Sequence, residues 1–144
     1  MSHPEKEVIK DVINDVGRLT DMKQWERLEQ LFIGSPVIDT KLLTGEQASQ
    51  TDRKNFISDL KQEMSKYFAG TRHKMKTFAV EVQGRKAEAY AIINRSHFIV
   101  EGTGRYVWQV SAAYTFELVK RAGQWRIAKL HLKPLNQSLL PMAV

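Results

Sequence analysis

The sequence contains no cysteine, and this absence removes several classes of chemistry. Without thiols there is no disulfide framework, no thiolate-bound zinc or iron–sulfur cluster and no cysteine nucleophile. A chain of 144 residues, with 42% hydrophobic and 26% charged residues, has no need of such cross-links, because it buries roughly two-thirds of its unfolded surface on folding. The sequence therefore predicts one globular domain over residues 1–144.

A long apolar run is also missing. The C-terminal segment 134–144 carries no charge, but it is far shorter than the ~20 apolar residues that cross a bilayer. Residues 1–7 are polar and do not have the apolar core of a secretory signal. We therefore expect a soluble, cytoplasmic protein with no membrane partner.

Acidic residues are scarce in the second half of the chain. Residues 71–144 carry 12 Lys or Arg against 4 Asp or Glu, whereas residues 1–70 carry 10 against 12. The cations are scattered along expected strands or lie at hairpin tips, with no basic run and no aromatic RNA-binding motif. We expect no nucleic-acid partner, for which steeply salt-dependent binding would be the sign. Attraction of an anionic substrate stays open.

The first seventy residues have the apolar spacing of helices. Residues 8–19 form one amphipathic stripe. Thr20 and Asp21, with Gln24 three residues after Asp21, are similar to a capping box and predict the start of a second helix. That helix is expected to stop at Gly34, ahead of a short β-like segment.

Further boundaries follow from caps and turns. The β-like segment covers residues 37–43, and Thr51–Asp52 predicts the N-cap of a third helix that ends at Ala69–Gly70. From residue 71 the apolar period switches to two, and three glycine-containing turns predict hairpins. The expected strands cover residues 71–82, 87–100, 106–119 and 125–132, with Pro134 ending the last strand.

This order of elements predicts an α+β fold with three helices against one face of an antiparallel sheet. Ala87, Ala89 and Ala91 lie on one face of the second long strand and allow close approach to it. Strands of this length are expected to curve, so that sheet and helices enclose a conical cavity.

Three segments carry a resemblance to a known family. Residues 19–28, 37–39 and the hairpin 116–127 resemble, in this order, the nuclear transport factor 2-like superfamily and its SnoaL-like members. The resemblance covers about residues 7–133. It implies a cone-shaped fold, with three N-terminal helices packed on a strongly curved, mostly antiparallel sheet.

Within that superfamily the pattern is most similar to scytalone dehydratase and the related dehydrochlorinases. Those enzymes use an aspartate at the start of the second helix and a histidine early in the strand after the third helix, matched here by Asp21 and His73. A second pocket histidine of the dehydratase is matched by His97. The resemblance implies that His73 is a general base, that Asp21 holds its imidazole and that His97 assists the leaving oxygen.

The residues themselves leave other interpretations open. Asp21 is also a preferred helix N-cap, a role that Thr20 can fill instead. With a period of two, His73 lies on an uncharged strand face, where a carboxylate partner would fix its tautomer. His97 shares a strand face with the apolar Ile93 but also with the charged Arg95. The sequence therefore allows His97 to lie either in the cavity or in water at a strand end.

Asp39 supports a rival chemistry. Ketosteroid isomerases place a proton-shuttling carboxylate near this position, where burial raises its pKa. Those enzymes also use a tyrosine on the first helix, and this sequence has none there. The dehydratase tyrosines are likewise replaced, by Thr20 and Thr40, which leaves the reaction type open.

Candidate substrate-binding residues are apolar or polar side chains expected near the cavity: Trp25, Asp39, Phe56, Trp108 and Tyr114. The histidine spacing is not that of a zinc or iron site, and phosphate-binding glycine motifs are missing, so we expect no metal and no cofactor.

Together these features predict a cofactor-independent lyase that removes water from a small apolar, aromatic or polyketide-like molecule. A ketosteroid isomerase-like or cyclase-like enzyme and a non-catalytic ligand-binding or assembly module remain alternatives. One sheet face stays uncovered by three helices, so we expect a homo-oligomer, dimer or trimer, through that face. The apolar tail is expected either to close the pocket or to pack on a neighbour.

Overall fold

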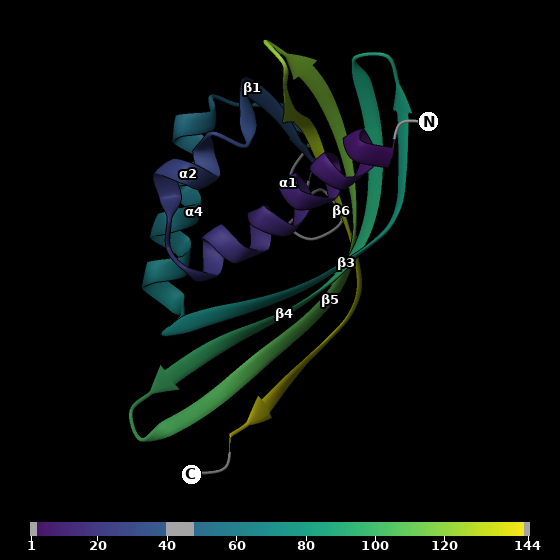
Figure 1. Cartoon of the computed structure of the whole chain (residues 1–144). Helices are drawn as coiled ribbons and strands as arrows, with labels where there is room; N and C mark the ends of the chain where they lie inside the picture. Colours follow the sequence, from purple (N-terminus) through teal and green to yellow (C-terminus); the bar gives the residue numbers. More distant parts are fainter. Residues whose placement is uncertain (1–2, 40–47, 143–144) are drawn as a thin grey trace.

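The computed structural model describes residues 3–39 and 48–142 (Figure 1). Its helices are α1 (His3–Asp21), α2 (Trp25–Glu29) and α4 (Arg53–Tyr67). Its strands are β1 (Phe32–Asp39), β2 (Ser49–Gln50), β3 (Gly70–Gln83), β4 (Lys86–Glu101), β5 (Gly104–Arg121) and β6 (Gln124–Pro141). Within these ranges no helix is both long and apolar enough to cross a membrane.

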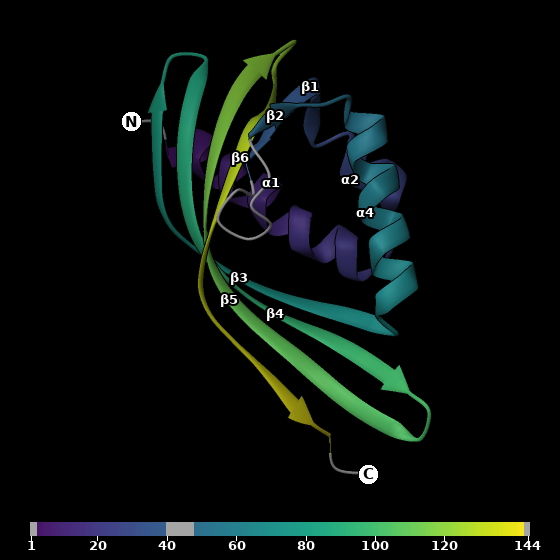
Figure 2. The ribbon, with the colours of Figure 1, turned by 180° about the vertical axis from the view of Figure 1, so that it is seen from behind.

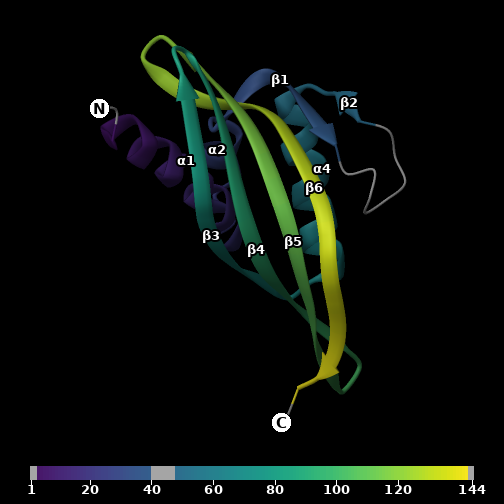
Figure 3. The same ribbon diagram turned by 90° about the vertical axis from the view of Figure 1, so that its right-hand side faces the viewer.

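The six strands form one sheet in the order β2-β1-β6-β5-β4-β3. Strands β1 and β6 are parallel, and every other neighbouring pair is antiparallel. The long strands β3 to β6 lie side by side and bend together (Figure 3). The helices lie in the hollow of this bend (Figure 2). The predicted α+β fold, with helices on one face of a strongly curved and mostly antiparallel sheet, is confirmed.

The three predicted hairpins join β3 to β4, β4 to β5 and β5 to β6. The last turn has positive φ at both central residues, 50° at Ala122 and 77° at Gly123. That geometry matches the right-handed twist of the flanking strands. The period-two pattern and the glycine turns therefore placed these boundaries to within a few residues.

Strand β6 corrects the prediction at Pro134. The strand continues to Pro141, with Pro134 paired to Ala112 beside a register shift at Ser111. Within the described residues, β1 pairs with β6 as far as His131, and beyond that point no described strand pairs with this edge of β6. A proline without an N–H is tolerated at such an edge. The described part of the apolar tail is therefore strand, and it does not line the cavity.

The predicted start of the second helix at Thr20 and Asp21 is wrong. Helix α1 runs through Asp21, and the chain then turns with a positive φ of 58° at Lys23. Gln24 is the N-cap of α2 and makes no side-chain cap bond. The Thr20 hydroxyl instead bonds back to a carbonyl inside α1. The Asp21 carboxylate is consequently not used as a cap.

The second helix is also shorter than predicted, because tertiary pairing starts a strand early. Helix α2 ends at Glu29, and β1 begins at Phe32, where it pairs with Ile127 of β6. The Leu31 carbonyl accepts a hydrogen bond of 2.7 Å from the Ile127 N–H. The part of the predicted segment 37–43 beyond Asp39 lies outside the described residues.

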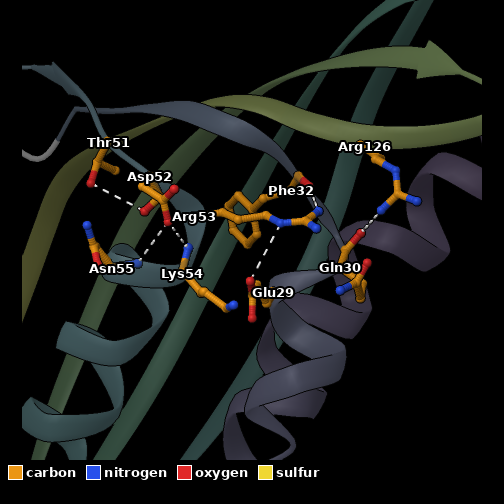
Figure 4. Close-up of polar contacts among 9 residues, drawn as sticks. All are labelled: Glu29, Gln30, Phe32, Thr51, Asp52, Arg53, Lys54, Asn55 and Arg126. Carbon is orange, nitrogen blue, oxygen red and sulfur yellow. Dashed lines mark hydrogen bonds and ion pairs between the residues drawn. The ribbon is translucent and has the colours of Figure 1, made fainter.

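The N-terminus of α4 is fixed as the sequence predicts (Figure 4). The Asp52 carboxylate accepts hydrogen bonds of 2.8 and 3.3 Å from two backbone N–H groups of the first turn. Arg53 then joins three elements: its guanidinium lies 3.6 Å from the Glu29 carboxylate of α2 and donates to the Phe32 carbonyl of β1 at 3.1 Å. These contacts fix the first turn of α4 against α2 and β1.

One apolar core joins the helices to the concave sheet face. Its most deeply buried members are Ile9, Ile13, Leu28, Phe32, Ala89, Ala91, Ile93, Ala112, Phe116, Leu118 and Ile127. Burial of such side chains contributes roughly 1.5–3 kcal/mol for each large one. The small alanines of β4 lie within this core, and the remaining space between helices and sheet forms the cavity described next.

Candidate active site

A cavity of about 410 Å³ lies between the concave sheet face and the helices. Its volume is within the range of ~300–1,000 Å³ that is usual for small-molecule sites. Apolar side chains make most of the wall: Val16, Leu28, Phe32, Ile38, Phe56, Ile57, Leu60, Met64, Met75, Leu130 and Leu132. The polar lining is Thr20, Ser49, Thr51, Asp59, Glu63, His73, Arg95 and Tyr114.

Asp21 and His73 form a hydrogen-bonded pair at this cavity. Asp21 is the last residue of α1 and His73 the fourth residue of β3, and β3 packs against α1. The His73 Nδ1 lies 2.6 Å from Asp21 Oδ1. No hydrogen bond within the described residues involves His73 Nε2, and the ring lines the cavity. A carboxylate at Nδ1 keeps the proton there and leaves Nε2 as the basic nitrogen.

Three donors hold the Asp21 carboxylate. The His73 ring and the Thr71 hydroxyl, at 2.9 Å, donate to Oδ1, and the His73 backbone N–H donates to Oδ2 at 2.7 Å. Burial raises the pKa of Asp21, but these hydrogen bonds outweigh it and leave the pKa below its ordinary value. They also offset the partial negative charge at the C-terminus of α1. Asp21 is therefore ionised at neutral pH and fixed in orientation.

Gly17 permits the close approach of α1 and β3 at this point. A Cβ atom at Gly17 would lie 2.8 Å from the His73 Cβ, closer than real side chains tolerate. A glycine inside a helix, one turn before Asp21, is the sequence signal for such a close approach of a neighbouring element.

His97 lies near the pair but not in the cavity wall. Only 2% of the residue is exposed, and its ring centroid is 6.3 Å from that of His73. Phe68 and Trp108 pack on it at centroid distances of 4.4 and 5.0 Å. Neither ring nitrogen has a partner among the described residues. Burial, aided by the charge of Arg95, lowers the pKa of His97 to about 4, so the ring is neutral at pH 7.

Arg95 is a cavity residue that sequence reasoning missed. It lines the cavity beside His73, and no salt bridge within the described residues includes it. Its Nε is buried without a hydrogen-bond partner in that part of the chain. The available signal was strand alternation, because Arg95 shares a strand face with the buried residues Ile93 and His97.

Of the five predicted substrate-binding residues, Phe56 and Tyr114 line the cavity. Burial raises the pKa of the Tyr114 phenol, an effect that the charge of Arg95 partly opposes. Trp25 and Trp108 do not line it: Trp25 is partly buried against the core, and Trp108 packs on His97 with its ring tilted by 41°.

Asp39 also lies outside the cavity wall, in a second aspartate–histidine pair. Its Oδ2 lies 2.9 Å from Nδ1 of His131, the residue opposite it in the parallel β1–β6 register. Leu130 and Leu132 line the cavity, so alternation turns His131 to the outer sheet face. Among the described residues, no three side chains of His, Asp or Glu converge as a metal site.

A model of the SnoaL-like domain matches residues 3–131. The chain belongs to the SnoaL-like family. No curated protein resembles this SnoaL-like chain closely enough to count as a match.

Solved structures share this SnoaL-like fold at low sequence identity. The Kfla4162 protein from Kribbella flavida has a TM-score of 0.89 at 20% identity, over 96% of this chain and 95% of that one. A scytalone dehydratase-like protein from Novosphingobium aromaticivorans has a TM-score of 0.78 at 18% identity, over 93% and 86%. A hexachlorocyclohexane dehydrochlorinase (LinA-type3) from Novosphingobium barchaimii has a TM-score of 0.75 at 18% identity, over 97% and 91%.

Proposed function

We propose that this protein is a cofactor-independent lyase in which His73 acts as general base. The observation that carries the proposal is the 2.6 Å contact between His73 Nδ1 and Asp21 at the wall of a mostly apolar cavity. A base held in one tautomer beside a substrate-sized space is what proton abstraction from carbon requires. Two structural neighbours bear the names of enzymes that eliminate water or hydrogen chloride, which supports this reaction class.

The proposed step is an elimination. His73 Nε2 takes a proton from a carbon of the substrate, and the electrons of that C–H bond form a double bond. The leaving hydroxide or chloride departs from the adjacent carbon with the electron pair of its own bond. The proton on His73 then passes to the hydroxide, which leaves as water, or to solvent. Asp21 stabilises the imidazolium in between, and the dry surroundings strengthen this interaction.

The substrate is a small molecule with a largely apolar body, in keeping with the side chains that line the cavity. His97 is neutral at pH 7 and lies behind the cavity wall. A small movement of Phe68 or Trp108 would expose His97 to the cavity, where it could form a hydrogen bond with the substrate. Because the ring is neutral at pH 7, we do not propose it as a general acid at that pH.

Two alternatives receive less support. An isomerase using Asp39 would need that carboxylate in the cavity, whereas Asp39 pairs with His131 on the outer face. For a carrier or assembly module we expect the Asp21 carboxylate to cap a helix terminus and His73 to have no carboxylate partner, and the contact between them does not favour this alternative.

The test is a screen of eliminations, because the substrate is not known. Scytalone, hexachlorocyclohexane, aromatic β-hydroxy ketones and aromatic β-hydroxy carboxylates are incubated with the wild type, His73→Gln and His131→Gln. Mass spectrometry detects water loss, and an ion-selective electrode detects chloride. We expect His131→Gln to match the wild type and His73→Gln to be slower by at least ~100-fold. Full activity in His73→Gln would refute the general-base role.

We also propose self-association through the sheet. The ends of the long strands extend beyond the helices (Figure 1). Large exposed apolar side chains near the C-terminal end of β4 and in the second half of β6 are Val100, Leu135, Leu139 and Leu140. An apolar surface of this kind is typical of interaction sites. Light scattering after gel filtration should give a dimer or trimer, and Leu139→Asp should shift it toward the monomer. A monomer at high concentration would contradict this proposal.

A further inference from the structure

Arg95 is a cation inside an apolar cavity without a protein anion to balance it. Its Nε is buried and has no hydrogen-bond partner among the described residues. No carboxylate in that part of the chain lies within salt-bridge distance of its guanidinium. Arg95 is half-buried, and its Nε is shielded from solvent, so this part of the guanidinium has lost its hydration without compensation. A guanidinium left unpaired at a ligand-sized cavity indicates that the ligand supplies the anion.

The sheet register places this cation next to the proposed base. Arg95 on β4 is the residue directly opposite His73 on β3, and both side chains line the cavity. Residues opposite each other on antiparallel strands have Cβ atoms about 4.5–5.5 Å apart. One small ligand therefore reaches both the guanidinium and the imidazole.

The other charged residues of the cavity lie differently. Asp59 and Glu63 are on α4 and are exposed to solvent, at the open side of the site. The concave sheet wall carries Arg95 and His73, and the Asp21 carboxylate of α1 is already held by three donors. The positive charge available to a bound ligand is thus that of Arg95.

We propose that the cavity takes small carboxylates with an apolar body, and that Arg95 binds the carboxylate. The planar guanidinium presents a fork of N–H donors that matches a carboxylate in two parallel hydrogen bonds. The apolar wall then accepts the rest of the molecule. The carboxylate is an anchor and takes no part in bond breaking. This inference names the substrate class of the proposed lyase. The carboxylate binding stands on Arg95 alone, and only the reaction of the bound molecule rests on the proposed function.

The test uses binding, so it does not need a known substrate. Isothermal titration calorimetry compares 2-naphthoate with the neutral 2-naphthamide on the wild type, Arg95→Gln and Arg72→Gln. Arg72 is the matched control, because it carries the same charge on the exposed outer face of β3, one residue from His73. We expect the wild type and Arg72→Gln to favour the carboxylate by about tenfold or more, and Arg95→Gln to lose this preference.

Several results would overturn the proposal: no naphthoate binding to the wild type, no preference over the amide, or an unchanged preference in Arg95→Gln. If Arg95→Gln fails to fold, Arg95→Met repeats the comparison with an apolar side chain of similar reach. His73→Gln separates the two proposals. It should keep naphthoate binding and lose elimination activity, so failure of the lyase and failure of the carboxylate anchor give different results.

Discussion

Two aspartate–histidine pairs occupy opposite faces of the same sheet, and only one of them is placed for chemistry. Asp21 and His73 meet at 2.6 Å on the concave side, where 8% of the histidine side chain is exposed. Asp39 and His131 meet at 2.9 Å on the outer side, where 37% of the histidine side chain is exposed. The two contacts use the same atoms, Nδ1 and a carboxylate oxygen.

The difference lies in what surrounds each pair. The cavity pair has a carboxylate fixed by three donors and an imidazole facing an apolar space. In the outer pair the histidine is more exposed to water, which weakens its electrostatic interactions, whereas the two carboxylates are similarly exposed, 20% for Asp39 and 22% for Asp21. The His73 imidazole lines a cavity, and the His131 imidazole does not. This surrounding, and not the sequence pattern or the distance, distinguishes the two pairs.

Removing each carboxylate in turn tests whether the two pairs differ in function. Asp21→Asn retains the size of the side chain but loses the charge that holds the His73 tautomer, so we expect elimination activity to fall by ~10²–10⁴-fold. Asp39→Asn should leave it within about twofold. Turnover of the substrate found in the screen gives the measurement. Equal losses of elimination activity in both variants would mean that the position of the Asp21–His73 pair at the cavity gives it no special role.

The fold was predictable from the sequence because its signals are local. The switch from helical to period-two spacing, the glycine turns and the Asp52 cap all act over a few neighbouring residues. The failures came where a distant partner decided the outcome. Phe32 joined β1 early because β6 offered a pairing strand, and β6 passed through Pro134 because β5 continued beside it.

The candidate site follows the same rule. Asp21 and His73 could be named together only through the family resemblance, since they lie 52 positions apart along the chain. The capping-box pattern at Thr20 pointed to another use of Asp21, which the tertiary hydrogen bonds replaced. The pairing of Asp39 with His131 depends on a parallel register that no local pattern encodes. Arg95 was visible as a residue, but its lack of a partner is a property of the packed structure.

Two glycines offer the next contrast, in stability. Gly17→Ala puts a methyl group 2.8 Å from the His73 Cβ, whereas Gly34→Ala meets no atom within 4 Å. Alanine normally stabilises a helix relative to glycine, but this clash should reverse the sign and cost about 1–3 kcal/mol. Urea denaturation measures both variants. A stabilised Gly17→Ala would show that α1 and β3 separate without cost and that Gly17 does not set the pair.

A third contrast is between the buried and the outer histidine, and it concerns pH. The pKa of His97 is about 4 in the folded protein, below its ordinary 6.5. The unfolded chain therefore binds the proton first, so stability is full above about pH 6.5 and falls as the pH drops toward 4. His97→Phe, which suits the aromatic surroundings, should flatten this fall, and His131→Gln should not. Denaturation curves between pH 4 and 7.5 decide the matter; an unchanged slope in His97→Phe would contradict it.

The smallest expected effect distinguishes two arginines on opposite faces. Arg95→Met removes a buried donor that has no partner in the described part of the chain, and such a donor costs about 1–3 kcal/mol. We expect this variant to be more stable than the wild type by about 1 kcal/mol, since binding sites retain groups that weaken the empty fold. Arg72→Met, on the exposed face, should change stability by less than about 0.5 kcal/mol. Thermal unfolding without ligand is the measurement. A destabilised Arg95→Met would mean that the guanidinium has a partner within the protein, and the cavity would then have no unpaired charge to offer a carboxylate.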